Sequence, residues 1–364
     1  MEGDLIKINR WLMPLSWIYG AVTAVRNWLF DIHVLRSVSY PVPVINVGNL
    51  TVGGTGKTPH VEYLIRLLSA NYKVAVLSRG YKRKTKGFVL ATKDSTMQEI
   101  GDEPWQVKQK FQDIYVAVDA NRRRGISRLL SSQETKDVDV ILLDDAYQHR
   151  YVKPSTNILL VDYHRMITDD CLLPAGRLRE SAKGCNRAKI VIVTKCPSQL
   201  TPMEYRVVQN ALDLRPYQHL FFSTFRYGEL QGLFNEKTRP ITSIEDEEHI
   251  MLLTGIASPE QMMMDLHRYT RHITPVSFPD HHFFTREDAV EIEKQFKSIP
   301  SPRFIITTEK DATRLRNCPE LSELVKQSLY VIPIEVDILR NEKTTFNEKI
   351  LKYVRKDSSN STMA

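Results

Sequence analysis

The sequence predicts an α/β fold in which a doubly wound, mostly parallel sheet is joined to a second, smaller α/β domain and preceded by an N-terminal amphipathic helix. Short, continuous apolar runs alternate with helical stretches from residue 43 onwards, as strands that are covered on both faces require. A second and shorter series of the same kind follows after residue 229. An uncharged, tryptophan-rich segment precedes the first run.

The composition is that of a folded protein long enough for two domains, with 364 residues of which 42% are hydrophobic and 26% charged. The formal net charge of +7 suits an anionic partner, although nucleotide, nucleic acid and anionic lipid would all satisfy it. The four cysteines show no C-x-x-C pair and no zinc-ligand spacing. Reduced thiols in a cytosolic protein are therefore the simplest account.

The N-terminal segment carries no charge between residues 11 and 25, and three of the four tryptophans lie within the first thirty positions. This run is too short for the ~20 apolar residues that span a bilayer. An interfacial helix fits better, with tryptophan at the level of the lipid headgroups. The alternative is an ordinary helix packed on the sheet. The cations expected on lipid phosphates are Arg10, Arg26 and Arg36.

A glycine-rich segment follows the apolar run at 44–47 and opens a predicted helix at Thr58. Its glycines permit positive φ angles and close backbone approach, so that consecutive N–H groups can surround a polyphosphate. Lys57 would reach the β- and γ-phosphates, and the Thr58 hydroxyl would ligate Mg²⁺. Thr51 stands where the motif has its first glycine, so a turn without ligand is the alternative. The predicted nucleotide-contacting residues are Thr51, Val52, Gly53, Gly54, Thr55, Gly56, Lys57 and Thr58.

The polar residues that follow the other strands are the remaining candidates, because ligands of such sheets gather at the carboxyl ends of the strands. Asp144 and Asp145 follow the run at 138–143 in the Walker B position, where carboxylates hold the Mg²⁺ shell. Solvated loop acids are the alternative. Arg79 follows the run at 74–77 and would neutralise phosphoryl charge. The sheet is thus P-loop NTPase-like. Its other strands are expected at 115–118, 158–161 and 190–193.

An acidic pair, Asp102 and Glu103, opens a predicted helix. Helix capping would explain one acid, whereas a base that orients an attacking hydroxyl would explain its place between glycine and proline. Arginine clusters at 122–124 and 177–179 favour anion recognition over a solvated face. Thr194-Lys195 ends a strand without the aspartate of a guanine reader, so the expected nucleotide is ATP.

The second series has expected strands at 250–253, 273–276, 304–306 and 329–333. Asp280 and His281 follow one of them, and an acid beside an imidazole orients it for proton transfer. A structural histidine capped by its neighbour is the alternative. We predict four segments: an N-terminal membrane-associating helical segment (1–36), a P-loop nucleotide-binding domain (37–228), a smaller α/β domain (229–356) and a disordered tail (357–364).

Seven motifs occur together in one order, at residues 49–58, 78–81, 101–104, 144–149, 174–180, 280–281 and 308–311. As an ordered set they resemble the tetraacyldisaccharide 4′-kinase family, the lipid A 4′-kinases of Gram-negative bacteria, from about the first helix to about residue 315. Ala146-Tyr147 stands where Gly-Phe is expected after the acidic pair, and this small-then-aromatic order preserves the shape.

The resemblance implies transfer of the ATP γ-phosphate to the 4′-hydroxyl of an acylated glucosamine disaccharide 1-phosphate, giving lipid IVA. It also implies ATP and Mg²⁺ as cofactors, no nucleic acid as partner, and a peripheral location on the cytoplasmic face of the bacterial inner membrane. A membrane-associated P-loop switch ATPase that acts on a protein partner is the alternative, but it leaves Asp102 and His281 unexplained.

By the same resemblance, Lys57 and Thr58 hold phosphate and Mg²⁺, and Arg79 assists the transferred phosphoryl group. Asp144 and Asp145 hold the metal. Asp102 and His281 form a dyad that takes the proton of the 4′-hydroxyl. The residues expected to orient substrate and nucleotide are Asn49, Glu103, Arg124, Gln148, His149, Arg177, Arg179 and Glu180.

Overall fold

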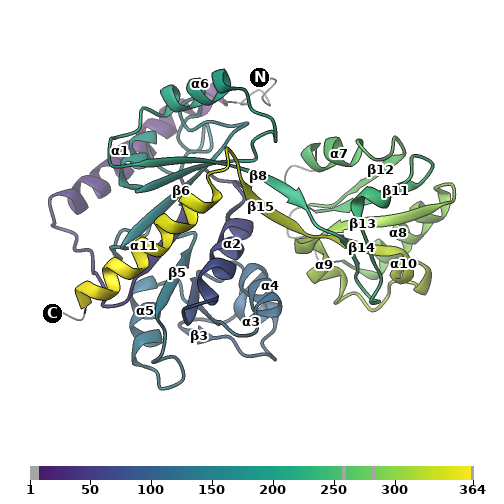
Figure 1. Ribbon diagram of the computed structural model, residues 1–364, viewed down its shortest axis with the longest axis horizontal. Coiled ribbons are helices and arrows are strands. Elements are labelled where there is room, and N and C mark those ends of the chain that lie inside the picture. Colours follow the sequence, from purple (N-terminus) through teal and green to yellow (C-terminus); the bar gives the residue numbers. More distant parts are fainter. Residues whose placement is uncertain (1–7, 256–259, 280–281, 283, 362–364) are drawn as a thin grey trace. The chain divides into compact units, whose positions relative to one another are not determined.

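The computed structural model describes residues 8–255, 260–279, 282 and 284–361, and the chain forms two compact units (Figure 1). The large unit comprises Met1–Phe225 and Val336–Ala364, and the small unit comprises Arg226–Glu335. Each unit has its own sheet and its own hydrophobic core. The predicted α/β class with a second, smaller α/β domain is confirmed.

The sheet of the large unit has, within the described residues, nine strands in the order β15-β8-β7-β6-β1-β5-β2-β4-β3. The central pairs are all parallel, from β4 across β2, β5, β1, β6 and β7 to β8, and the short β3 is antiparallel to β4. Complete burial of β1, β2, β5 and β7 explains the continuous apolar runs of the sequence. The strands are β1 (Val44–Asn49), β2 (Val74–Ser78), β3 (Val89–Leu90), β4 (Tyr115–Val118), β5 (Val140–Asp144), β6 (Thr156–Asp162), β7 (Ile190–Thr194), β8 (His219–Tyr227) and β15 (Ile334–Ile338).

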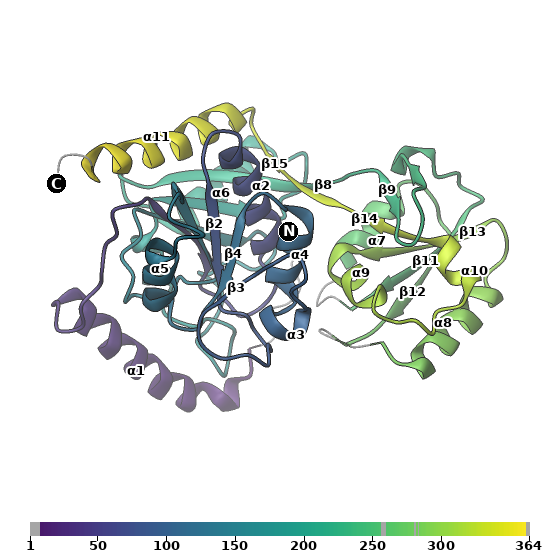
Figure 2. The same ribbon diagram turned by 90° about the horizontal axis from the view of Figure 1, so that it is seen from below.

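Helices cover both faces of this sheet, as the doubly wound prediction requires. One core lies under α2, α4 and α11, and two others lie on the opposite face under α5 and α6. Figure 2 shows α11 and α1 on opposite sides of the sheet. The helices are α1 (Met13–Asp31), α2 (Lys57–Ser69), α3 (Met97–Ile100), α4 (Asp102–Lys110), α5 (Arg122–Ser131), α6 (Pro202–Leu212) and α11 (Lys343–Ser361), with 3₁₀ turns at Arg10–Leu12 and Ala182–Arg187.

The small unit has a six-stranded sheet in the described residues, ordered β10-β9-β14-β13-β11-β12. Strands β12, β11, β13 and β14 are parallel, and β9 and β10 are added in antiparallel fashion. The strands are β9 (Leu230–Gly232), β10 (Thr238–Arg239), β11 (His249–Thr254), β12 (Ile273–Ser277), β13 (Arg303–Thr308) and β14 (Leu329–Ile332). The helices are α7 (Glu260–Leu266), α8 (Arg286–Ser298), α9 (Glu309–Leu315) and α10 (Glu323–Ser328), with a 3₁₀ turn at Ile241–Ser243.

The C-terminal part of the chain differs from the prediction. The small domain was expected to run to residue 356, but the chain returns to the large unit at Val336, where β15 joins the sheet beside β8 and α11 follows. Helix α11 also continues to Ser361, into the segment from 357 onwards that we predicted to be disordered. Its apolar residues complete the core beneath α2, which explains the return: Phe346, Ile350 and Val354 are all buried.

We expect Phe346→Ala to lower the free energy of unfolding of the large unit by about 3 to 5 kcal/mol, the usual cost of emptying a buried aromatic site. Phe346 is 2% exposed and packs edge-on against Tyr63 and Phe221. All four tryptophans lie in the large unit, so urea unfolding followed by tryptophan fluorescence reports on this unit alone.

Lys352→Ala is the matched control, because Lys352 lies exposed on the same helix. It is expected to change stability by no more than about 0.5 kcal/mol. A Phe346→Ala protein that unfolds with the same midpoint as the Lys352→Ala protein would contradict the packing of α11.

Candidate functional site

The phosphate loop, residues 51–58, connects β1 to α2 and is held by residues at the ends of β1 and β7. Asn49 Nδ2 donates a hydrogen bond to Thr55 Oγ1 (2.8 Å), and Thr194 Oγ1 at the end of β7 donates to the Thr55 carbonyl (3.0 Å). Gly53 and Gly56 have φ angles of +123° and +79°, which favour glycine. The result is a buried Thr55 anchor with the segment 52–54 exposed, and helix α2 begins directly after Gly56.

The predicted basic cluster at 177–179 lies beside this loop. Val52 N donates to the Arg177 carbonyl (2.8 Å) and Arg179 N donates to the Leu50 carbonyl (2.7 Å), so the two segments run together like a short ladder. A Cβ atom built on Gly53 would lie 3.9 Å from Arg177 Nη1. The Arg177 guanidinium is therefore next to the loop, and the prediction that this cluster faces the same anion has a geometric basis.

The acidic pair lies at the same edge of the sheet, because β1 and β5 are parallel and pair Val47 with Asp144. Asp145 accepts hydrogen bonds from Arg179 Nη1 at both carboxylate oxygens (3.0 and 3.1 Å) and lies 3.7 Å from Lys57 Nζ. Burial opposes ionisation, but the charges of Lys57 and Arg179 prevail and lower the pKa of Asp145. Asp145 is thus an anion held between two cations of the phosphate-loop region.

Asp144 has fewer partners. It is 7% exposed, Ser78 Oγ donates to its Oδ2 (3.3 Å), and its Oδ1 is buried with no hydrogen-bond partner within the described residues. Burial, followed by the charges of Glu103 and Asp145, raises its pKa to about 7. A buried carboxylate oxygen of this kind needs an explanation, and a cation supplies one.

The residues present fit Mg²⁺, which takes one or two carboxylates and completes its octahedron with phosphate oxygens and water. Asp144 and Asp145 provide the carboxylates, and Thr58 lies in the first turn of α2. The described residues contain no group of three or more His, Cys, Asp or Glu side chains that could hold a metal by themselves. A metal at this position would therefore take its remaining ligands from water or phosphate oxygens.

The sequence analysis placed Arg122 in an arginine cluster but singled out Arg124, whereas Arg122 is the one that contacts the acidic pair. It is 3% exposed, and its Nη2 donates to the carbonyls of Asp144 (3.3 Å) and Asp145 (3.5 Å), fixing the backbone of the acidic pair. The predicted Arg124 instead forms a bidentate pair with Asp119 (2.7 and 2.8 Å). Helical periodicity could have shown that Arg122, and not Arg124, is the buried arginine. Arg122 shares a face of α5 with the buried residues Gly125, Ile126 and Leu129.

Two glycines bring Arg79 and Asp102 into one region. A Cβ atom on Gly101 would lie 3.0 Å from the Tyr81 carbonyl and 3.3 Å from Gly80 Cα, so the loop after β2 touches the start of α4. Asp102 and Glu103 form the first turn of α4, and the charge of Glu103 is felt by Asp144. The structure thus joins the loop after β2, the acidic start of α4 and the metal-site acid.

Several predicted substrate-orienting residues are buried beneath these groups. Gln148 Nε2 donates to the Asn49 carbonyl (2.8 Å) and to Glu180 Oε1 (3.1 Å), and Arg187 Nη2 also donates to Glu180 Oε1 (2.7 Å). Asn49 and Glu180 are 0% and 3% exposed. These residues support the phosphate loop and the segment that carries Arg179, and their contact with substrate stays a prediction.

His149 is a partly buried residue of the same region. Burial, followed by the charges of Arg122 and other arginines, lowers the pKa of His149 to about 4, so its imidazole is neutral at physiological pH. Its ring packs against Tyr151. Asp280 and His281 lie outside the described residues, and the predicted pairing of His281 with Asp102 stays a prediction. The neighbouring His282 contacts Asp288 instead (2.8 Å).

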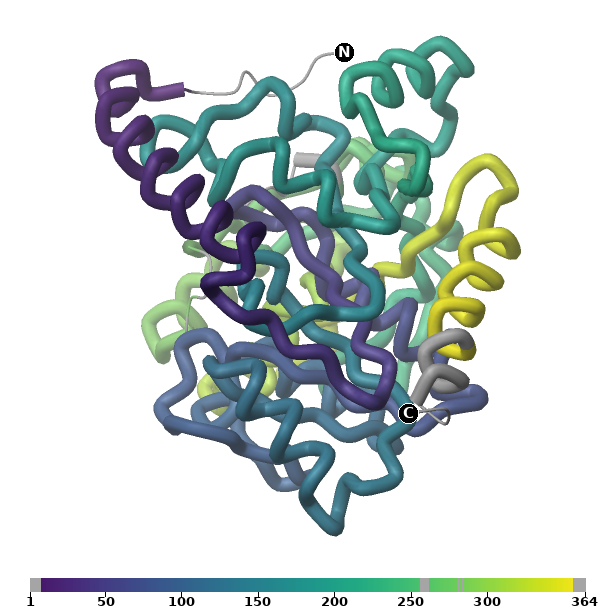
Figure 3. Tube along the Cα trace, turned by 90° about the vertical axis from the view of Figure 1, so that its left-hand side faces the viewer, coloured from purple at the N-terminus to yellow at the C-terminus, as the bar shows by residue number. Residues whose placement is uncertain are grey.

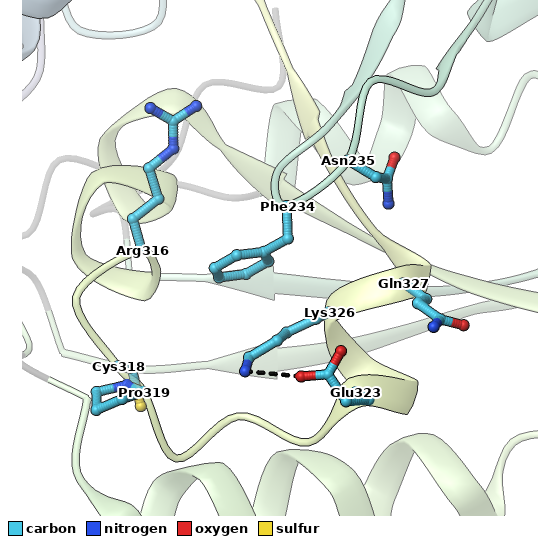
Figure 4. A pocket seen from close by; sticks show the side chains of 8 residues that line it. All are labelled: Phe234, Asn235, Arg316, Cys318, Pro319, Glu323, Lys326 and Gln327. Atoms are coloured by element: carbon cyan, nitrogen blue, oxygen red, sulfur yellow. Dashed lines mark hydrogen bonds and ion pairs between the residues drawn. The ribbon is translucent and has the colours of Figure 1, made fainter.

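The small unit has a surface pocket of about 350 Å³ (Figure 4). Its lysine, Lys326, is paired with Glu323 at 3.0 Å, so the positive charge that an anion would need is partly neutralised. None of its lining residues was predicted as a site residue, and the converging charges at the phosphate loop are a stronger indication of function. The lining residues are Phe234, Asn235, Arg316, Cys318, Pro319, Glu323, Lys326 and Gln327.

Comparison with known proteins matches residues 8–355 to the model of one family, tetraacyldisaccharide-1-P 4′-kinase. A relative from Phocaeicola vulgatus, named tetraacyldisaccharide 4′-kinase, is 55% identical over 366 residues and covers 100% of both chains. A relative of the same name from Flavobacterium johnsoniae is 46% identical, covering 96% of this chain and 98% of its own. A crystal structure of the "apo" form of LpxK from Aquifex aeolicus in complex with ATP is 27% identical, with a TM-score of 0.70 and coverage of 94% and 98%.

We expect the affinity of the nucleotide-free protein for Mn²⁺, used as a probe for Mg²⁺, to weaken about tenfold per pH unit below about pH 7 and to level off above it. The reason is that the raised pKa of Asp144 leaves it protonated below about 7, and a cation must displace that proton. Calorimetric titrations in buffers of different ionisation enthalpy would show proton release only on the acidic side. Asp144→Asn should abolish this pH dependence, and a flat wild-type profile would contradict the role of Asp144.

Proposed function

Because the chain belongs to the tetraacyldisaccharide 4′-kinase family, we propose that the phosphate loop holds ATP, that Thr58, Asp144 and Asp145 hold Mg²⁺, and that the surrounding arginines stabilise the transferred phosphoryl group. The protein is an ATP-dependent kinase that phosphorylates the 4′-hydroxyl of tetraacyldisaccharide 1-phosphate in lipid A biosynthesis. The observation that carries the site assignment is the convergence of Lys57 and Arg179 on Asp145.

Phosphoryl transfer depends mainly on positioning and on neutralising charge. Lys57 lies within reach of Asp145, and its ammonium group is at the start of α2, where it would turn to the β- and γ-phosphates. Thr58, Asp144 and Asp145 would hold Mg²⁺, whose charge would offset that of the phosphates. Arg179 adds fixed positive charge beside Asp145, Arg79 is proposed to add more at the transferred phosphoryl group, and Arg122 keeps the backbone of the acidic pair in place.

For the acceptor we propose that Asp102, together with His281, takes the proton of the 4′-hydroxyl. The position of Asp102 in the first turn of α4, beside the loop that carries Arg79, supports a role next to the phosphates. Glu103 and Arg177 are proposed to orient the acceptor and nucleotide, with Asn49, Gln148 and Glu180 supporting them from below. Arg124 and His149 are proposed at the rim of the site.

The N-terminal helix supports a membrane location. An outward apolar stripe runs from Trp11, just before α1, through Leu15, Ile18, Val22 and Val25 on the helix to Ile32, just after it. The spacings are three, four and seven residues, and Trp11 is 93% and Ile18 64% exposed. The opposite, polar side of α1 binds the protein: Tyr19 OH donates to the Arg179 carbonyl (2.7 Å) and Asn27 Nδ2 donates to Glu180 (3.0 Å). Figure 3 shows α1 along the outer edge of the large unit.

This polarity is the reverse of an ordinary surface helix, which favours the interfacial interpretation over a core helix. None of the helices in the described ranges is long and apolar enough to cross a bilayer. We therefore propose that α1 lies in the surface of the inner membrane on its cytoplasmic face, where an acylated acceptor is found. Arg26, expected at lipid phosphates, instead donates to the Gln148 carbonyl (2.9 Å), which leaves Arg10 and Arg36 for that role.

We expect the double change Ile18→Glu with Val22→Glu, in the middle of the stripe, to weaken binding to vesicles that contain phosphatidylglycerol by at least about tenfold. The reason is that charged side chains replace apolar contacts with the lipid. Both side chains are exposed, so thermal stability should be unchanged. Met203→Glu is the control, since Met203 is an equally exposed apolar residue on α6. Equal co-sedimentation of all variants would contradict the membrane role.

The purified chain with radiolabelled ATP, Mg²⁺ and the disaccharide 1-phosphate in detergent should transfer label to the lipid. Asp102→Asn and His281→Ala are expected to reduce this transfer at least about a hundredfold while ATP binding is kept, since general-base catalysis is lost. Asp113→Asn and His272→Ala, at exposed positions, serve as controls. Release of phosphate without labelled lipid would instead indicate a switch ATPase.

A further inference from the structure

His60 connects the phosphate loop to the strand by which the chain leaves the large unit. It lies on α2, one turn after Gly56, and is 3% exposed. Its Nδ1 is 2.7 Å from the Gly56 carbonyl and its Nε2 is 3.0 Å from Ser223 Oγ on β8. A carbonyl can only accept, so Nδ1 carries the proton and the Ser223 hydroxyl donates to Nε2. The Nδ1-protonated tautomer of His60 therefore makes both hydrogen bonds, to the Gly56 carbonyl and to the Ser223 hydroxyl.

A second residue of β8 contacts the same glycine. A Cβ atom on Gly56 would lie 2.6 Å from Phe225 Cζ, which shows how closely the ring approaches the loop backbone. The rings of Phe225 and His60 are edge-to-face with centroids 6.3 Å apart. Ser223 and Phe225 are two positions apart in a strand and so project from one face of it. This face of β8 thus reaches Gly56 in two ways: through Ser223, by way of the His60 imidazole, and through the ring of Phe225.

The position of β8 in the chain gives this contact its significance. The first segment of the large unit ends at Phe225 and the small unit begins at Arg226. Strand β8 is therefore the strand by which the chain passes from the large unit to the small unit. The returning strand β15 is its neighbour in the sheet, and Leu339 N donates to the Phe222 carbonyl just beyond it (2.9 Å). Gly56, the last glycine of the phosphate loop, therefore contacts the strand that leads out of the large unit as well as the core of that unit.

We propose that His60 is a positioning residue for ATP: it holds the Gly56 carbonyl so that the amides that follow face the phosphates, and it transmits the state of the loop to β8 through Ser223. The proposal rests on the proposed function in that the loop binds ATP. Neither His60 nor Ser223 is placed in contact with nucleotide, metal or acceptor. Their effect on ATP therefore passes through Gly56.

The test uses the full chain with His60→Leu, His60→Asn and Ser223→Ala. Leucine removes both hydrogen bonds, and alanine at 223 removes one. Asparagine can still donate to the Gly56 carbonyl from the position of Nδ1 but is too short to reach Ser223. Tyr63→Phe is the matched control, because Tyr63 lies on the same helix and its hydroxyl makes one hydrogen bond, to Asn347 on α11.

We expect His60→Leu to raise the KM and the Kd for ATP about tenfold, and the two single-bond variants to raise them about threefold, the range for lost buried hydrogen bonds. The KM for the disaccharide should stay within about twofold of wild type, since only the ATP loop is affected. Adding Ser223→Ala to His60→Leu should cost nothing more, because both changes break the same bond. Tyr63→Phe should leave both KM values unchanged.

Hydrogen exchange tests the link to β8. A non-hydrolysable ATP analogue should slow amide exchange in residues 219–227 of the wild type and of Tyr63→Phe, and should do so much less in His60→Leu and Ser223→Ala. Unchanged ATP parameters in folded variants would overturn the proposal, and so would equal losses for both substrates with a lowered Tm. If His60→Leu does not fold, Ser223→Ala and His60→Asn decide. Absence of ATP binding by the wild type would instead refute the proposed function itself.

Discussion

The pairing of Asp145 with Lys57 and Arg179 is the interaction on which the site depends. Three charged groups, from the residue after β5, from α2 and from the 177–180 segment, are held together at the edge of one sheet, and each is costly to bury without the others. Arg122 adds a buried guanidinium beneath them and satisfies the two carbonyls of the acidic pair. Asp144 has fewer partners, and burial together with the charges of Glu103 and Asp145 raises its pKa. In the proposed function, the charge of bound Mg²⁺ would compensate this carboxylate.

Most of the fold follows from local rules of sequence. The central strands of the large unit were predictable because parallel strands buried on both faces must be continuously apolar, and the phosphate loop because glycine, lysine and threonine are each required at fixed places. The return of the chain at Val336 was not predictable in this way. Residues 334–354 have the pattern of one more strand and helix, and nothing local indicates which of two sheets they join.

The same limit applies to the candidate site. Asp144, Asp145, Lys57 and Arg179 were recognised by their chemistry, but the choice between Arg122 and Arg124 depends on which side of α5 faces the sheet. Asn49 and Glu180 were expected to orient substrate, and their burial could not be read from the sequence, because a side chain's type does not reveal its depth. The role of His60 is invisible in the sequence, since Ser223 and Phe225 lie more than 160 positions away.

Helix α1 has a consequence for how the enzyme meets its acceptor. One side of it is committed to the segment that carries Arg179 and Glu180, and the other side is apolar and exposed. A helix fastened in this way cannot move without disturbing the segment that carries Arg179 and Glu180. If its apolar stripe lies on the bilayer, the distance between the site and the acyl chains is fixed. The sugar must then reach that height above the membrane. The distance by which the headgroup protrudes would therefore determine which substrates can react.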